Sequence, residues 1–266
     1  MRRFLSIVSL GLPLVFPVVS ATGLPAQTPP ASAEKTAPRP RTAEQLLDEV
    51  CAVLKNARSF TVDMDITYDA VLDSGSKVQY SAYQQVWVQK PDRLRSDYIG
   101  DERATRFYYD GKTATLQDTN RNLYATKTAP NTLDGALNQV EEKYGITIPM
   151  SNLAAGDPCA DIKANVSRMI FVGVDMVNRV PMYHLLLIGS DRDFQLWITR
   201  EPRPLLKKAI ITYKNLPGAP QYTAVLSNWN FNPKIPANTF TFTPPKGSIG
   251  IEFLPETGNE TGDRSQ

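Results

Sequence analysis

The chain has 266 residues, of which 42% are hydrophobic and 21% are charged, and its formal net charge is +2. This near balance argues against a nucleic-acid-binding protein, which needs a concentrated basic surface to neutralise phosphates. The single histidine and the two widely spaced cysteines also exclude a multi-histidine metal site and the clustered ligands of structural zinc.

Residues 1–21 have the three parts of a secretory signal peptide. Two arginines follow the initial methionine, the run Phe4–Val19 is mostly apolar, and small residues precede Ala21. The run is too short for a membrane span, which needs about 20 uninterrupted apolar residues. We expect cleavage after Ala21, with Ala26 as the alternative. Because the first cysteine, Cys51, lies far beyond this run, we expect a soluble periplasmic protein that is not a lipoprotein and keeps no transmembrane anchor.

The rest of the chain divides into three parts by composition. Residues 22–41 are rich in proline, alanine and threonine and are expected to form a flexible Pro-rich linker, because they contain too little apolar surface to offset the entropy lost on ordering. Residues 256–266 are polar and are expected to form a disordered tail. Residues 42–255 have no internal linker and are expected to form one domain.

This domain is expected to open with a helix. Thr42 and Gln45 fit a capping box, in which each side chain binds an otherwise unpaired backbone N–H. The apolar residues that follow recur at helical spacing and share one face: Leu46, Leu47, Val50, Cys51 and Leu54. A helix with one apolar face predicts a surface against which it packs.

A long antiparallel strand is expected next. Residues 60–70 alternate between apolar and polar side chains, a period typical of a strand with one solvated face. The segment Asp73-Ser74-Gly75-Ser76 predicts a turn, and residues 77–89 predict the returning strand. Four more strands continue this meander, at residues 93–99, 103–109, 113–118 and 122–127.

Helical spacing interrupts the strands between residues 131 and 166. Leu133, Leu137, Val140 and Tyr144 predict one helix, and Asp157-Pro158 predicts the start of another. Five further strands are expected at residues 167–177, 181–189, 193–199, 205–213 and 221–231. The predicted fold class is therefore mainly β (α+β), with a single large curved antiparallel sheet of about eleven strands covered by about three helices.

Two cysteines in an exported chain indicate a disulfide, because oxidising compartments preserve such bonds. A bridge between Cys51 and Cys159 would close a loop of roughly 100 residues and contribute about 4–5 kcal/mol in the chain-entropy model. Two buried free thiols are the alternative.

Several motifs resemble a known family of predicted periplasmic proteins. They are Phe107-Tyr108-Tyr109-Asp110-Gly111-Lys112, Gln195-Leu196-Trp197-Ile198, Arg203-Pro204-Leu205, Ile211-Thr212-Tyr213-Lys214 and Phe240-Thr241-Phe242-Thr243-Pro244-Pro245. That family is similar to the LolA-like lipoprotein-carrier superfamily. The resemblance implies a half-barrel whose concave face is roofed by helices, with an apolar cavity that holds acyl chains or other lipids.

The chain offers little for catalysis. His184 is the one histidine, it lies in a predicted strand, and the sequence has no G-x-S-x-G nucleophile motif. Asp63, Asp65 and Asp69 share one face of a strand, which is typical of a solvated face rather than of the loop that wraps a cation. We therefore expect no enzyme activity, no cofactor and no metal, with a hydrolase acting through His184 as an alternative.

The leading hypothesis is a periplasmic protein that shelters a lipid or lipid-modified ligand in an apolar cavity. An envelope interaction or sensor protein that docks a protein partner is the alternative. Aromatic residues of the sheet either line this cavity or fill a core. The expected lining consists of Val62, Met64, Ile66, Val86, Tyr98, Phe107, Tyr109, Leu186 and Leu196.

Overall fold

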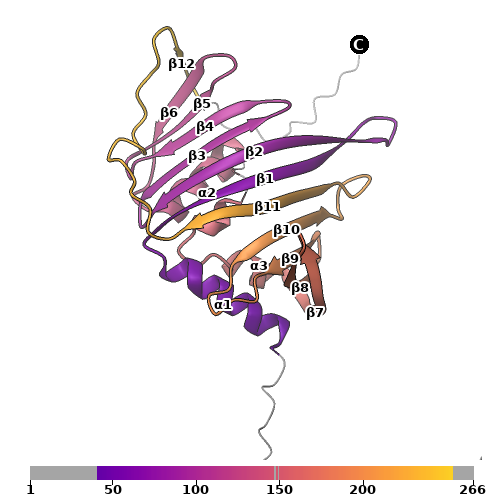
Figure 1. Cartoon of the computed structure of the whole chain (residues 1–266). Helices are drawn as coiled ribbons and strands as arrows, with labels where there is room; N and C mark the ends of the chain where they lie inside the picture. Colours follow the sequence, from indigo (N-terminus) through magenta and orange to yellow (C-terminus); the bar gives the residue numbers. More distant parts are fainter. Residues whose placement is uncertain (1–40, 147, 149, 254–266) are drawn as a thin grey trace, which may run out of the picture. The chain divides into compact units, whose positions relative to one another are not determined.

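A computed structural model of the chain describes residues 41–146, 148 and 150–253. These residues form one sheet of twelve strands in the order β12-β6-β5-β4-β3-β2-β1-β11-β10-β9-β8-β7. Figure 1 shows the strands fanned side by side, with α2 behind β1 and β2. The expected fold class, a single large curved antiparallel sheet with helices packed against it, is confirmed. The expected signal peptide, the linker up to residue 40 and the tail after residue 255 lie outside the described residues.

The sheet consists of two meanders joined by the pairing of β1 with β11. The first meander contains β1 (Ser59–Val71), β2 (Lys77–Gln89), β3 (Arg93–Gly100), β4 (Ala104–Tyr109), β5 (Thr113–Asp118) and β6 (Leu123–Thr128). The second contains β7 (Val166–Val177), β8 (Val180–Gly189), β9 (Arg192–Ile198), β10 (Leu206–Tyr213) and β11 (Gln221–Asn230). These eleven antiparallel strands lie where the sequence predicts them.

A twelfth strand, β12 (Ile249–Ile251), pairs in parallel with β6 at one edge of the sheet. The sequence did not predict it, because three residues are too few to show a period of two. The segment that leads to β12 packs against β4 and β6 through Phe242, which contacts the rings of Tyr108 and Tyr124. The chain thus covers the β6 edge with its own residues, whereas among the described residues nothing pairs with the outer edge of β7.

The period of two in β1 separates the two faces of the sheet. Phe60, Val62, Met64 and Ile66 are at most 1% exposed and point to the side on which the helices pack, which we call the covered face. On the other side, Asp63 accepts a hydrogen bond from Asn228 Nδ2 at 2.7 Å. Since β1 pairs with β2 along its whole length, this alternation also fixes which β2 side chains face the helices.

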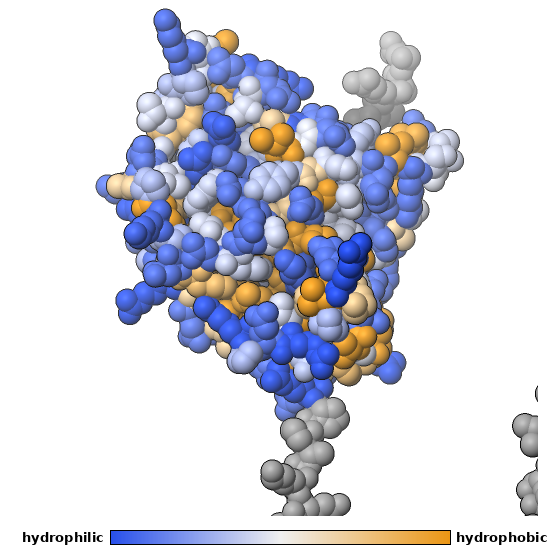
Figure 2. Space-filling view, in the orientation of Figure 1, coloured by the Kyte–Doolittle hydropathy of each residue, from blue (hydrophilic) through white to orange (hydrophobic). Residues whose placement is uncertain are grey.

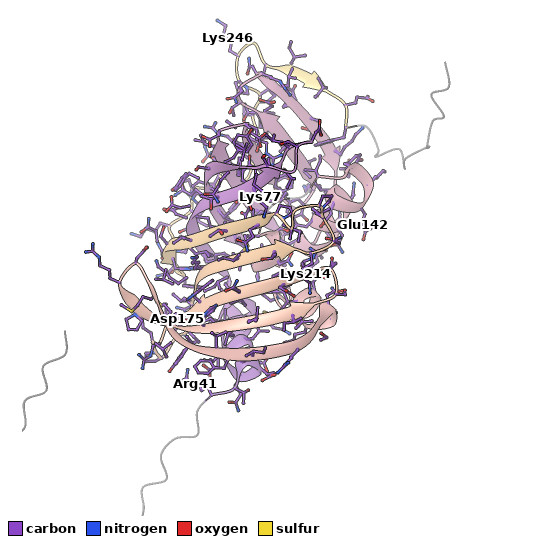
Figure 3. All side chains as sticks on the ribbon, turned by 90° about the vertical axis from the view of Figure 1, so that its right-hand side faces the viewer. Arg41, Lys77, Glu142, Asp175, Lys214 and Lys246 are labelled. Atoms are coloured by element: carbon purple, nitrogen blue, oxygen red, sulfur yellow. A yellow bond between two sulfur atoms is a disulfide. The ribbon has the colours of Figure 1, made fainter. Side chains whose placement is uncertain are left out.

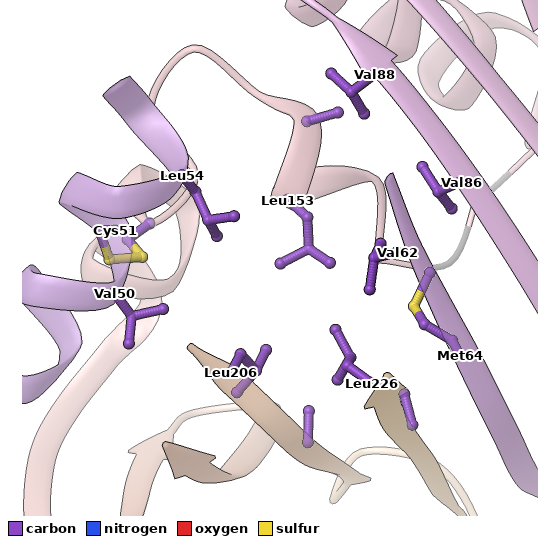
Figure 4. Packing of buried hydrophobic residues seen from close by; sticks show 14 of the residues in the cluster. Val50, Cys51, Leu54, Val62, Met64, Val86, Val88, Leu153, Leu206 and Leu226 are labelled. Carbon is purple, nitrogen blue, oxygen red and sulfur yellow. A yellow bond between two sulfur atoms is a disulfide. The ribbon is translucent and has the colours of Figure 1, made fainter. Parts of the chain in front are cut away.

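Helix α1 (Ala43–Asn56) supplies most of the cover. Its predicted capping box is confirmed: Gln45 N–H donates to Thr42 Oγ1 at 3.2 Å, and Thr42 N–H donates to Gln45 Oε1 at 3.0 Å. The predicted apolar face of α1 is fully buried. In Figure 4, Val50 and Leu54 of this helix point toward Leu206 and Leu226 of the sheet.

Three shorter helices follow β6 and precede β7 along the chain: α2 (Leu133–Tyr144), the 3-10 helix η1 (Ser151–Ala154) and α3 (Ala160–Asn165). Thr132 caps the start of α2, with its Oγ1 accepting from Gly135 N–H at 3.2 Å, and Gly145 in the left-handed conformation caps its end. Helix α3 begins at Ala160, later than the predicted start at Asp157-Pro158, and Asp157 instead accepts from the backbone N–H of Cys159.

The predicted disulfide between Cys51 and Cys159 is confirmed. It joins α1 to the residue that precedes α3, with a Cα–Cα distance of 5.9 Å and a sequence separation of 108 residues. Figure 4 shows the bridge beside Val50 and Leu54. The bond therefore ties the main covering helix to the segment that connects the two meanders.

We expect the Cys51→Ala/Cys159→Ala variant to lose about 2–5 kcal/mol of unfolding free energy, because the unfolded chain regains the entropy of a long closed loop. Urea unfolding followed by tryptophan fluorescence measures this loss. A reducing agent should lower the stability of the wild type to that of the variant and leave the variant unchanged. Equal urea midpoints for the variant and the oxidised wild type would contradict the prediction.

Candidate functional site

A cavity of about 230 Å³ lies between α1, the segment that connects the two meanders (residues 148 and 150–162, the connecting segment) and strands β9–β11. Its wall is mainly apolar. Helix α1 contributes Leu47, Val50 and Leu54, the connecting segment contributes Ile148, Met150, Leu153, Cys159 and Ile162, and the strands contribute Phe194, Leu196, Ile198, Leu206, Ala209, Ile211 and Tyr222. A mainly apolar pocket of this kind favours an apolar ligand.

The space inside the cavity depends on the lengths of the side chains in its wall. Ala209 and Ala224 lie opposite each other on β10 and β11, and both are almost fully buried on the covered face. Ala209 lines the cavity, and a leucine or phenylalanine at that position would fill part of the space. The disulfide fixes Cys159 in the opposite wall, so α1 and the connecting segment stay attached to each other over this space.

Three charged residues lie in the lining: Glu141 of α2, Asp161 of α3 and Arg192 at the start of β9. The Arg192 guanidinium donates to Asp191 Oδ2 through Nη2 at 2.7 Å and through Nε at 3.0 Å. These hydrogen bonds lower the pKa of Asp191 and raise that of Arg192. Arg192 therefore has an anionic partner of its own beside the cavity.

Two smaller hollows continue under the connecting segment. One, of about 10 Å³, lies beside Met64, Val86 and Leu153, and the other, of about 70 Å³, lies beside Tyr98 and Phe107. Ile148 lines all three hollows. Side chains of the connecting segment thus divide the space over the sheet into one larger and two smaller parts.

The structure brings eight of the nine predicted lining residues to the covered face, in one apolar cluster. Leu196 lines the larger cavity. Met64 and Val86 line the smallest hollow, and Tyr98 and Phe107 line the third. The remaining three, Val62, Ile66 and Tyr109, are at most 1% exposed and line none of these hollows, so they serve as packed core.

Leu186 does not join this group, because it lies on the other face of β8. Its neighbours Leu185 and Leu187 are fully buried on the covered face instead. Successive residues of a strand point to opposite faces, so an error of one position moves a side chain from one side of the sheet to the other. The run Leu185-Leu186-Leu187 is apolar throughout. It therefore shows no alternation from which to predict which of these residues faces the helices.

The wall residues that the sequence interpretation missed come from α1, from the connecting segment and from β9, β10 and β11. Leu206, Ala209, Ile211 and Tyr222 belong to strands that the sequence did predict. Strand β10 has no regular alternation that could have identified its wall residues, because a register shift lies between Leu206 and Lys208. Ile148, Met150 and Ile162 also carry no such signal, because the segment between α2 and α3 is irregular.

Tyr222 places a buried polar atom in this otherwise apolar region. Its hydroxyl oxygen is fully buried and has no hydrogen-bond partner among the described residues. Burial raises the pKa of the Tyr222 hydroxyl, so the group stays protonated and neutral. The hydroxyl of Tyr109, by contrast, donates a hydrogen bond to the backbone oxygen of Pro130.

His184 lies on the face opposite the cavity. Its Nδ1 is 2.7 Å from Asp175 Oδ2, its Nε2 is 3.1 Å from Gln195 Oε1, and its ring stacks on Trp197. Figure 3 shows Asp175 on the strand at the edge of the sheet. Both ring nitrogens thus contact a carboxylate or an amide rather than a hydroxyl or thiol, so these contacts hold no candidate nucleophile for the alternative hydrolase.

The outer edge of the sheet is apolar. Phe171, Val172, Val174, Met176 and Val180 of the β7–β8 hairpin are between 38% and 64% exposed. In Figure 2, orange side chains gather at the lower right, where Figure 1 places β7 and β8. In the part of the chain that the structure describes, no helix is long and apolar enough to span a bilayer.

Comparison with known proteins identifies the family. The chain matches the model of the DUF2092 family, described as predicted periplasmic protein, over residues 43–254. This match covers most of the chain, and the protein belongs to that family. The expected periplasmic location and the family resemblance are thereby confirmed. A search of curated proteins found no match.

Solved structures with similar folds share little sequence with this chain. An uncharacterised conserved protein from Thermus thermophilus is 8% identical, with a TM-score of 0.47, and the match covers 79% of this chain and 98% of that one. A LolA superfamily protein from Nitrosomonas europaea is 14% identical, with a TM-score of 0.38 and coverages of 76% and 99%. The lipoprotein LppX from Mycobacterium tuberculosis is 12% identical, with a TM-score of 0.40 and coverages of 71% and 94%.

The two tyrosines make a matched test of the buried hydroxyl. We expect Tyr222→Phe to raise the unfolding free energy by about 1 kcal/mol, because it removes a buried polar atom without a partner. We expect Tyr109→Phe to lower it by about 1 kcal/mol, because it removes a hydrogen bond. Urea unfolding of both variants measures the difference. A loss of stability in Tyr222→Phe as large as that in Tyr109→Phe would show that the Tyr222 hydroxyl has a partner.

Proposed function

We propose that this protein is a non-enzymatic periplasmic binding protein that shelters an acyl chain in the cavity between α1, the connecting segment and β9–β11. The observation that supports this proposal is the cavity itself. It has a volume of about 230 Å³, and its wall draws mainly apolar side chains from three separate parts of the chain. A core whose only role was stability would gain from filling that space, because empty volume costs packing energy.

The energetics favour an aliphatic ligand. Each buried CH₂ group contributes about 0.8 kcal/mol, so a chain of about eight such groups would contribute roughly 6 kcal/mol before the costs of ordering the ligand. The wall offers many branched aliphatic side chains, which suit a chain without hydrogen-bonding groups. This composition supports binding by apolar burial, as a carrier requires.

The proposal does not include catalysis. His184, the one imidazole of the chain, is on the opposite face of the sheet from the cavity and is held by Asp175 and Gln195. Three charged residues line the cavity: Glu141, Asp161 and Arg192. Among the described residues, no hydrogen bond joins any of them to a hydroxyl or thiol that could act as a nucleophile. The role we propose therefore rests on shape and apolar surface.

A role in docking an envelope protein is the second candidate, and one observation favours it. The outer edge of β7 has no partner strand among the described residues, and its apolar side chains are exposed. An edge of this kind can accept a strand from another protein. We rank this role second because β7 carries register shifts between Val166 and Arg168 and between Phe171 and Gly173, and such bulges disfavour edge pairing.

Native mass spectrometry of the protein purified from a periplasm tests the proposal. We expect additional mass of a few hundred daltons that is lost on denaturation. Ala209→Leu should abolish it, because the longer side chain extends into the cavity. Lys208→Leu places the same side chain one position away on the other face and should retain the ligand.

The melting temperature of Ala209→Leu must be measured in parallel, because added volume in a packed region costs about 1–3 kcal/mol. A folded Ala209→Leu that carries as much ligand as Lys208→Leu would show that the ligand binds elsewhere. A wild type without extra mass that also fails to take up added acyl compounds would remove the proposal and favour the docking role.

A further inference from the structure

We infer that the ligand of this cavity carries one acyl chain on an uncharged polar group, such as an ester or an amide, and that Glu141 and Asp161 disfavour the binding of free fatty acids. This inference rests on the proposed function and goes further, since it names the class of ligand and two residues that determine specificity.

The size of the cavity limits the ligand to one chain. Sites for drug-sized ligands usually measure about 300–1,000 Å³, and this cavity of about 230 Å³ lies below that range. The adjoining hollows measure about 10 and 70 Å³ and are separated from it by side chains that include Ile148. A lipid with two or three long chains would therefore have to leave chains outside the wall.

The charges of the lining disfavour an anion. Two of the three charged lining residues are carboxylates, Glu141 and Asp161, and both are exposed to solvent at the rim. The third, Arg192, already has Asp191 as its partner at 2.7 Å. A carboxylate head group would therefore meet two carboxylates that repel it, whereas the one guanidinium is already paired with Asp191 and is also attracted to Asp161.

Two nearby lysines, Lys163 and Lys214, do not compensate for these carboxylates, because each has its own anionic partner. Lys163, close to Asp161 on α3, pairs with Asp48 of α1. Lys214, labelled in Figure 3, pairs with Asp193 at 2.7 Å. Among the described residues, Glu141 forms no ion pair, and Asp161 accepts a hydrogen bond from Asn165 without an ion pair of its own.

Neutral polar groups remain available at the same place. Ser151, Asn152 and Tyr213 line the cavity together with the charged residues. Their hydroxyl and amide groups can donate to the carbonyl oxygen of an ester or an amide without adding charge. The rim therefore suits a polar but uncharged group at the end of the buried chain.

The test compares dodecanoic acid with its methyl ester, two ligands that share the chain and differ in the charge of the head. Both compete with the neutral fluorescent probe N-phenyl-1-naphthylamine at about pH 8 and low ionic strength. We expect the ester to displace the probe at a concentration roughly three- to tenfold lower than the acid. Repulsion between like charges near a protein surface lowers the affinity for the acid by about that factor.

Two variants assign this preference to residues. Glu141→Gln/Asp161→Asn should increase the affinity for the acid severalfold and leave the affinity for the ester unchanged. Glu142→Gln is the matched control, since Glu142 follows Glu141 on α2 and does not line the cavity (Figure 3). This control should keep the wild-type preference.

The outcomes separate this inference from the proposed function. Equal affinities for acid and ester in the wild type would overturn the inference and leave the proposed function standing. A preference that Glu141→Gln/Asp161→Asn does not alter would also overturn it. Failure of both ligands to displace a bound probe would instead contradict the proposed function itself.

Discussion

The structure depends on the burial of one face of β1 in the apolar core beneath the helices. Phe60, Val62, Met64 and Ile66 alternate with polar residues, and each is at most 1% exposed. Because β1 lies at the centre of the sheet and joins both meanders, its orientation decides which side of every other strand faces the helices. The cavity, the core and the opposite face all follow from that assignment.

The main covering helix is tied to neighbouring parts of the chain. The disulfide from Cys51 joins α1 to the segment before α3. In addition, Lys90 Nζ donates to the backbone oxygens of Leu54 and Ala155 at 3.0 and 2.9 Å, so the end of α1 and the connecting segment meet on one side chain. These attachments keep the helices at a fixed distance from the sheet. The cavity can therefore persist beside a densely packed core.

Much of the fold could be predicted from sequence because its signals are local. Alternation over residues 60–70 and 77–89, the turn between them and the capping box each involve neighbours along the chain, and the structure confirms all three. The cavity depends instead on residues that are distant in sequence, such as Ala209 and the irregular segment that contains Ile148. Whether side chains fill the space above the sheet depends on their volumes and positions in the folded protein. For this reason the sequence could not show that Val62, Ile66 and Tyr109 are packed core. The orientation of Leu186 was missed for another reason, since its apolar neighbours gave no period of two.

The central claim is that the cavity between α1 and β9–β11 holds an acyl chain. A crystal structure of the protein with the methyl ester of a bromine-labelled fatty acid tests it most directly, because anomalous scattering locates the bromine atom. Our account predicts a peak inside the cavity, within contact distance of Leu196 and Leu206. A bromine found only at the exposed edge of β7, with the cavity unoccupied, would contradict it.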